Sequence, residues 1–167
     1  MATAYTIPTS PNHTSPSLAV TAAWTLAAGL VATVIFDAFG QHLAPALGWP
    51  GLAPVPLARQ VLRVTLGLND PTIAHALHWF TGIVGYALGY VLVARPVARI
   101  VTPWMPGVVV GTIYGVALWV FALYVMAHLV AGNPPFLGFG RLTWVALAGH
   151  VVYGVVLAAA LGLRRNA

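Results

Sequence analysis

One aspartate and five histidines lie in or at the ends of the apolar stretches of this chain, and their side chains are the ones that can do chemistry. These residues are Asp37, His42, His75, His78, His128 and His150. Imidazoles bind haem iron and transition-metal ions, and they exchange protons near neutral pH. Ionisable groups inside a membrane are costly and usually face a bundle interior or a cavity. The six residues are therefore the candidates for a functional site.

Three kinds of site fit these residue types. In the first, two imidazoles from different helices bind haem b, with His78 paired with His128 or His150. In the second, three or more of the histidines with Asp37 hold a copper, zinc or iron ion, because the absence of cysteine disfavours a thiolate site. In the third, Asp37 and the histidines form a hydrogen-bonded or proton-relay site for a quinone head group. The structural alternative is that histidines at helix ends are tolerated at the membrane interface, and that only Asp37 and His150 need internal partners.

Signatures of soluble enzymes and of nucleic-acid binding are missing. The chain has no nucleophile elbow, no phosphate loop and no paired carboxylates. Its second acid, Asp70, stands between Asn69 and Pro71 and is typical of a turn and helix cap. The seven arginines are scattered singly or in pairs, which does not make a nucleic-acid-binding stripe.

The composition indicates which elements position the candidate residues. Of 167 residues, 60% are hydrophobic and 5% are charged, whereas soluble domains have about a quarter charged residues. Disorder needs low hydrophobicity and is excluded. The chain is therefore predicted to be an integral membrane protein with the lipid bilayer as its solvent.

Four windows have the length of a membrane-spanning helix, about 20 residues. They are 18–43, 72–93, 106–131 and 142–163. The sequence thus predicts an all-α, polytopic four-helix bundle that forms one domain over residues 17–167. Residues 1–16, rich in Ser, Thr and Pro, are predicted to be a flexible tail.

An even number of spans places both termini on one side, and all six candidate residues fall in the opposite half of the membrane. Four arginines lie on the side of the termini and three on the other. They are Arg95, Arg99, Arg164 and Arg165 against Arg59, Arg63 and Arg141. This weak asymmetry favours cytoplasmic termini in a bacterial inner membrane and a periplasmic site.

The link between the first two spans contains an amphipathic stretch, Leu57–Leu68, with Pro56 in its first turn. It is typical of a short helix lying at the membrane interface, and an ordinary structured loop is the alternative.

Small and polar residues are spaced as the packing of helices requires. Glycines spaced three or four apart in the second and third spans favour close helix contacts. They are Gly82, Gly85 and Gly89, and Gly107, Gly111 and Gly115.

Each span also has one face that carries its polar or aromatic residues. These stripes are Thr33, Asp37 and Gln41; His75, His78 and Gly82; Tyr114, Ala117, Phe121, Tyr124 and His128; and Thr143, Ala146, His150 and Tyr153. We expect the four stripes to face a common axis.

The segments Gly107–Trp119 and Gly149–Leu157 give the second half of the chain its resemblance to small bacterial four-helix inner-membrane proteins of unknown function. Ala27–Thr33 resembles the first helix of that group. The resemblance covers about half of the chain through apolar motifs. It implies four helices and a histidine on the last one, and it implies no activity.

The function predicted from these features is that of a small membrane subunit or accessory of a redox complex, with a His/Asp site for haem b or a metal ion. Its partners would be membrane proteins or further copies of the chain. Two alternatives stand beside it: a structural subunit without a cofactor, and a proton or small-ion path through Asp37.

Overall fold

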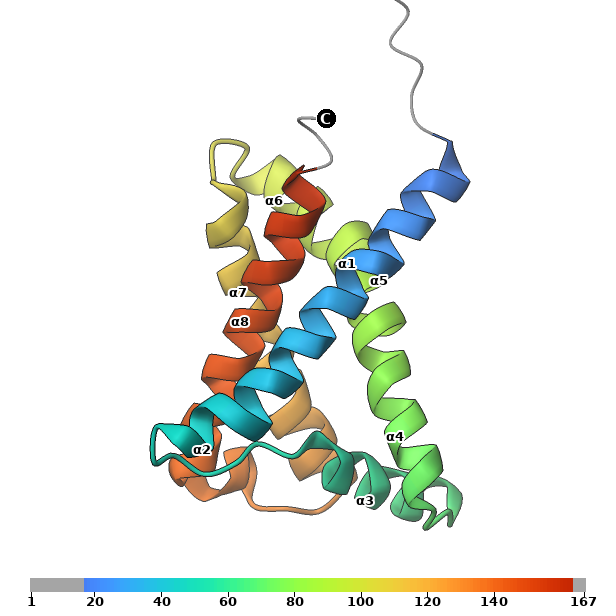
Figure 1. The fold of residues 1–167 in the computed structure, drawn as a ribbon, viewed down its shortest axis with the longest axis vertical. Helices are drawn as coiled ribbons and strands as arrows, with labels where there is room; N and C mark the ends of the chain where they lie inside the picture. The colour runs from blue at the N-terminus through green and yellow to red at the C-terminus, as the bar shows by residue number, and fades with distance from the viewer. Residues whose placement is uncertain (1–16, 164–167) are drawn as a thin grey trace, which may run out of the picture.

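The computed structural model describes residues 17–163, which are helical with no strand (Figure 1). Four of its helices are long and apolar enough to cross a membrane, as the sequence predicts. They extend over Leu18–Ala46, Pro71–Val101, Gly107–Val130 and Arg141–Leu163 and are called spans 1 to 4. The proposed tail 1–16 lies outside the described residues, as do Arg164 and Arg165.

Spans 1 to 3 combine α-helical with π-helical segments, whereas span 4 is α-helical throughout. Span 1 comprises α1 (Leu18–Ala38), the π-helix η1 (Phe39–Leu43) and α2 (Ala44–Ala46). Span 2 comprises α4 (Pro71–Phe80), η2 (Thr81–Tyr86), α5 (Ala87–Gly89), η3 (Tyr90–Ala94) and α6 (Arg95–Val101). Span 3 comprises α7 (Gly107–Val120) and η4 (Phe121–Val130), and the 3₁₀ turn η5 (Pro135–Phe139) precedes span 4, α8 (Arg141–Leu163).

Local signals fix where several helices begin and end. The Ser17 hydroxyl accepts a hydrogen bond from the Val20 N–H at the start of α1. The Asp70 carboxylate accepts bonds from the N–H groups of Thr72 and Ile73, which confirms it as the cap of α4. Span 2 runs through Arg95 to Val101, beyond the expected end at Val93, so Arg95 and Arg99 lie on a helix and not in a link.

The spans run up and down, so that the start of α1, the end of α8 and α6 lie at one end of the bundle (Figure 1). The helix α3 (Pro54–Leu66) lies across the other end, where the chain crosses from span 1 to span 2. This is the short helix expected in the link, and it begins two residues earlier, at Pro54 instead of Pro56. Gly67, in the left-handed region at φ 69°, ends it.

Spans 3 and 4 are in close contact along glycines. A Cβ on Gly154 would clash with the backbone of Gly111 and Gly115, so the backbones of α7 and α8 touch directly. Gly111 and Gly115 thus have the expected packing role, but nothing lies within 4 Å of an added Cβ at Gly107.

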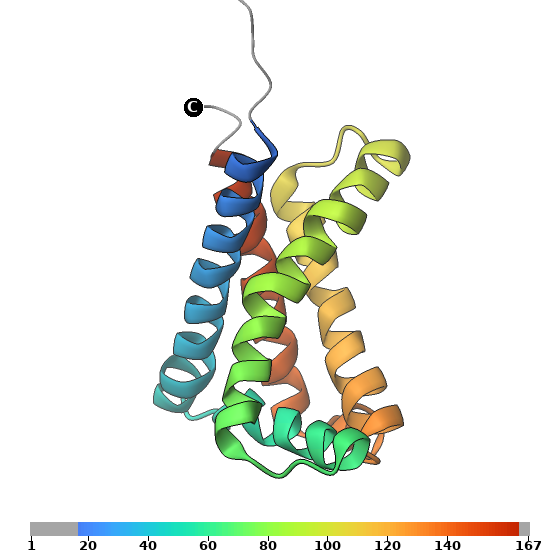
Figure 2. The ribbon, with the colours of Figure 1, turned by 90° about the vertical axis from the view of Figure 1, so that its right-hand side faces the viewer.

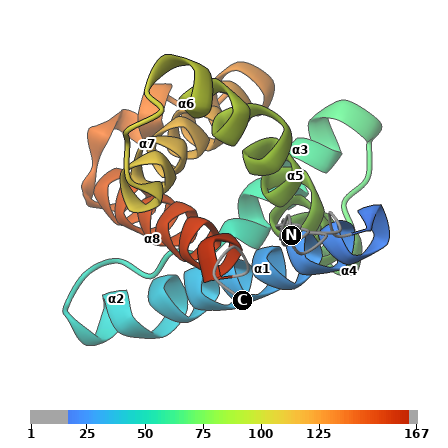
Figure 3. The ribbon, with the colours of Figure 1, turned by 90° about the horizontal axis from the view of Figure 1, so that it is seen from above.

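Spans 2 and 3 are joined midway and then diverge. The Tyr114 hydroxyl donates a 2.6 Å hydrogen bond to the backbone oxygen of Tyr86. Span 2 crosses the bundle obliquely, with α4 leading down beside α3 and η4 lying apart from it (Figure 2). Seen from above, the four spans are arranged around a common axis (Figure 3). The candidate residues lie in the α3 half of the bundle.

Candidate functional site

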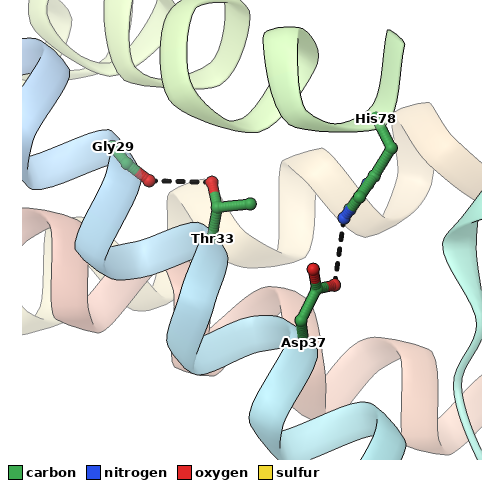
Figure 4. Close-up of polar contacts among 4 residues, drawn as sticks. All are labelled: Gly29, Thr33, Asp37 and His78. Carbon is green, nitrogen blue, oxygen red and sulfur yellow. Dashed lines mark hydrogen bonds and ion pairs between the residues drawn. The ribbon is translucent and has the colours of Figure 1, made fainter. Parts of the chain in front are cut away.

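An Asp–His pair joins the first two spans. Asp37 is in the last turn of α1, and its Oδ1 lies 2.9 Å from Nε2 of His78 on α4 (Figure 4). The side chain of Asp37 is 18% exposed and that of His78 is 12% exposed, so the contact is largely buried. A carboxylate bound to one imidazole nitrogen fixes the orientation and the tautomer of the ring.

Only part of the polar stripe of span 1 faces the interior. Thr33 is buried, donates to the Gly29 backbone oxygen at 2.7 Å (Figure 4) and packs against Gly82. Gln41 is exposed instead. It lies in η1, whose wider turns shift every following side chain around the helix axis, so a spacing of four no longer keeps one face.

His150 is the most buried of the histidines in the described chain, at 7% exposure. Its Nδ1 lies 2.7 Å from the Ala146 backbone oxygen, one helical turn earlier. In the neutral ring Nδ1 therefore donates, and Nε2 keeps its lone pair for another partner. Phe36 lies beside both His150 and His78, with ring-centroid distances of 5.2 and 6.2 Å.

His128 belongs to a polar network that ends span 3. Its Nδ1 donates to the Asn133 backbone oxygen at 2.7 Å, and the Asn133 amide donates to the Gln60 side chain and to the Ala127 oxygen. Gln60 in turn donates to the Ala131 oxygen at 3.0 Å. The network satisfies carbonyls at the helix end and holds α3 against span 3.

The six candidate residues are not gathered at one point. His42 and His75 are exposed. Across residues 17–163, no group of three or more His or Asp side chains could hold a metal ion. His78 presents to Asp37 the same nitrogen that axial ligation of haem ordinarily uses. Haem b and a metal ion therefore stay predictions, and the pair Asp37–His78 with His150 is what the fold brings together.

A cavity of about 740 Å³ lies among the spans next to this group. Its lining is mostly apolar, and the π-helical segments η2 and η4 supply much of it. Its polar side chains are Thr33, His78, Thr81, Gln60, Asn133, His150, Tyr86 and Tyr153. Volume and lining match those of sites for small organic ligands, and π-helical turns often occur at functional sites.

The cavity opens sideways between spans 2 and 3. Phe80 of α4 and Phe121 of η4 both line it, yet they are 61% and 42% exposed. Both lie within apolar membrane-spanning helices, so the opening between them faces lipid tails. The sequence identified the histidines as candidate site residues but did not predict this opening, because no residue pattern indicates that two helices diverge.

Gln60 and Asn133 are the polar residues that sequence reasoning missed. A signal existed for Asn133, since an Asn after a Gly and before two prolines is typical of a helix end. Gln60 lies in the amphipathic stretch Leu57–Leu68, whose pattern gives no sign of a partner, and that partner, Asn133, is 73 residues away in sequence.

Comparison with known proteins gives no match: none among family models, none among curated proteins and none among solved structures. The resemblance to small bacterial inner-membrane proteins stays a prediction, and function has to be argued from the site itself.

Proposed function

We propose that this protein is a small subunit or accessory of a membrane redox complex that binds a lipid-soluble quinol or quinone in its cavity. The observation that carries the proposal is the cavity of about 740 Å³ that opens toward lipid and is lined by His78 and the buried His150. A ligand that reaches such an opening has to be soluble in the bilayer. A long-tailed quinol combines an apolar body with a head group that needs a few polar partners.

The hydrogen-bonding state of the two imidazoles favours the reduced ligand. In the neutral form each ring uses one N–H internally, His150 toward Ala146 and His78 toward Asp37. Each ring then keeps one lone pair, which accepts a hydrogen bond. Quinol hydroxyls donate, whereas quinone carbonyls only accept.

Binding of decylubiquinol and decylubiquinone, quinone analogues with a short tail, tests the proposal. The purified protein in lipid nanodiscs is titrated under anaerobic conditions and followed by tryptophan fluorescence. We expect saturable binding, tighter for the quinol. His150→Leu removes an acceptor in a buried site and should raise the Kd for the quinol about tenfold. His75→Gln is the matched control, because His75 lies on the same helix as His78 but is exposed.

Two results would count against this function. One is that the wild-type protein shows no saturable binding of the quinol and takes up decylbenzene, which has no polar head group, equally well. The other is a purified protein with a Soret band or a stoichiometric metal ion that disappears on replacing His78, His128 or His150, which would favour haem b or a metal ion instead.

The proposal includes an orientation in the bacterial inner membrane, with cytoplasmic termini and the site in the periplasmic half. The arginine asymmetry and the common end of α1 and α8 support it. Fluorescent-protein and alkaline-phosphatase fusions at the C-terminus test it: fluorescence without phosphatase activity is expected, and the reverse pattern would invert the orientation. Affinity purification from membranes of the source cell tests the redox partner, and recovery of the chain alone at native expression levels would argue against an accessory role.

A further inference from the structure

Two hydroxyl groups that line the large cavity have no hydrogen-bond partner within the described part of the chain. They belong to Thr81 and Tyr86, the first and last residues of η2, and both side chains are half-buried. No side-chain nitrogen or oxygen of residues 17–163 is both buried and without a partner, so neither hydroxyl oxygen is sealed inside the packed protein. Each can therefore bond to a group that enters the cavity.

The other polar side chains around the cavity already have hydrogen bonds inside the protein. Thr33 and Tyr153 donate their hydroxyl protons to backbone oxygens of spans 1 and 2. Gln60 and Asn133 donate within the network at the end of span 3. In the neutral form the two imidazoles each use their N–H internally and keep only a lone pair. The two hydroxyls of η2 are thus the donor groups around the cavity that no bond inside the described chain engages.

The π-helical geometry of η2 explains why two residues five apart line the same cavity. In an α-helix, such residues lie about 140° apart around the axis. The i→i+5 hydrogen bonding of a π-helix brings them nearly one above the other. Thr81 and Tyr86 both line the cavity, on the same span as His78. The Tyr86 ring is positioned by edge-on contacts with Phe121 and Tyr153, at centroid distances of 6.4 and 5.8 Å.

We propose that Thr81 and Tyr86 bind the oxidised ligand by donating hydrogen bonds to the carbonyl oxygens of a quinone; this assignment rests on the proposed function. A quinone carbonyl only accepts hydrogen bonds, so the lone pairs of His78 and His150 cannot bond to it. The two hydroxyls can, because a hydroxyl is a donor as well as an acceptor. The cavity then has imidazole acceptors for the quinol and hydroxyl donors for the quinone.

The Kd values of decylubiquinone and decylubiquinol, measured separately with the protein in lipid nanodiscs, test this division. Thr81→Val/Tyr86→Phe removes both hydroxyls with little change in volume and should raise the Kd for the quinone about tenfold. The Kd for the quinol should change less than about threefold, because the quinol hydroxyls donate to the imidazoles. The matched control is Thr112→Val/Tyr124→Phe, which removes the same atoms from span 3, outside the cavity lining. It should leave both Kd values unchanged.

Infrared difference spectroscopy detects the hydrogen bonds themselves. The ligand is decylubiquinone with isotope-labelled carbonyl carbons, at a concentration that saturates each variant. The carbonyl band of the bound quinone should lie at a lower frequency than that of the free quinone, and it should move back toward the free value in Thr81→Val/Tyr86→Phe. Thr81→Ser retains the donor and should retain the band position and the Kd of the wild-type protein.

The outcomes distinguish this assignment from the proposed function. An equal rise of both Kd values in Thr81→Val/Tyr86→Phe, or a quinone Kd and carbonyl band that this variant leaves unchanged, would overturn the role of the hydroxyls while the quinol site stands. A Thr81→Ser protein that behaves like the double variant would overturn it too. If the wild-type protein bound neither redox form saturably, the proposed function would fail and the assignment with it.

Discussion

Two helix interfaces of this bundle differ in what their residues allow. Between α7 and α8, glycines bring the backbones into contact, and a Cβ at Gly154 has no room. Between spans 2 and 3, a hydrogen bond from Tyr114 joins the helices midway, and beyond it the aromatic residues Phe80 and Phe121 face an opening. In lipid, close packing takes the place of the hydrophobic effect between helices. The α7–α8 contact therefore supplies stability, and the interface without such packing is where a ligand can bind.

The largest expected effect comes from changing the packed interface. Gly154→Ala should lower the free energy of unfolding by about 3 kcal/mol, since the methyl group meets the backbone of Gly111. Unfolding in mixed micelles with increasing sodium dodecyl sulfate, followed by circular dichroism, measures it. Gly162→Ala is the same change on the same helix with nothing within 4 Å, and it should be neutral or slightly stabilising. Equal behaviour of the two variants would refute the close contact.

The Asp–His pair should have an intermediate effect. Asp37→Leu leaves the His78 Nε2 without its partner and is expected to cost about 1–3 kcal/mol. In the double variant Asp37→Leu/His78→Leu the loss should be smaller than the sum of the single losses by about 1 kcal/mol, when measured by the same unfolding method. Strict additivity would mean that the two side chains do not interact.

The hydrogen-bond network of Gln60 and Asn133, which holds α3 against span 3, is expected to contribute less to the free energy of unfolding. Asn133→Ala removes donors to Gln60 and to the Ala127 oxygen, at a cost of about 1 kcal/mol. Hydrogen exchange should increase in Pro54–Leu66 and not in span 4. Asn69→Ala, which removes an exposed contact with Arg59 near the same helix, serves as the control and should have little effect.

Filling the open interface should have the smallest effect on stability. Gly85 lines the large cavity, and an added Cβ there meets nothing within 4 Å. Gly85→Leu should not lower the free energy of unfolding. Its side chain should fill part of the large cavity and thereby raise the Kd for decylubiquinol more than tenfold. A stable variant that binds the quinol normally would place the ligand elsewhere.

Much of the fold follows from the sequence because membrane spans are long, apolar and bounded by helix breakers. The inward face of span 4 is also predictable: Thr143, Ala146, His150 and Tyr153 are all buried, as a regular α-helix requires. The same spacing rule does not hold in span 1 at Gln41, where η1 alters the number of residues per turn.

The site itself was only partly predictable. The sequence puts Asp37 and the five histidines of the spans in one half, but their partners depend on tertiary contacts. His128 bonds to the backbone at the end of its own helix, while His78 reaches Asp37 across 41 residues. Neither the divergence of spans 2 and 3 nor the resulting cavity has a local signal, since both depend on the relative tilt of whole helices.

Photolabelling tests the central claim most directly, namely that the cavity between spans 2 and 3 holds a quinol-type ligand. The protein in lipid nanodiscs is irradiated with an azidoquinone, digested, and analysed by mass spectrometry. The account predicts labels on the cavity-lining segments of α4, η2 and η4, and competition by excess decylubiquinol. Labels spread over the outer surfaces of spans 1 and 4, unaffected by the competitor, would contradict it.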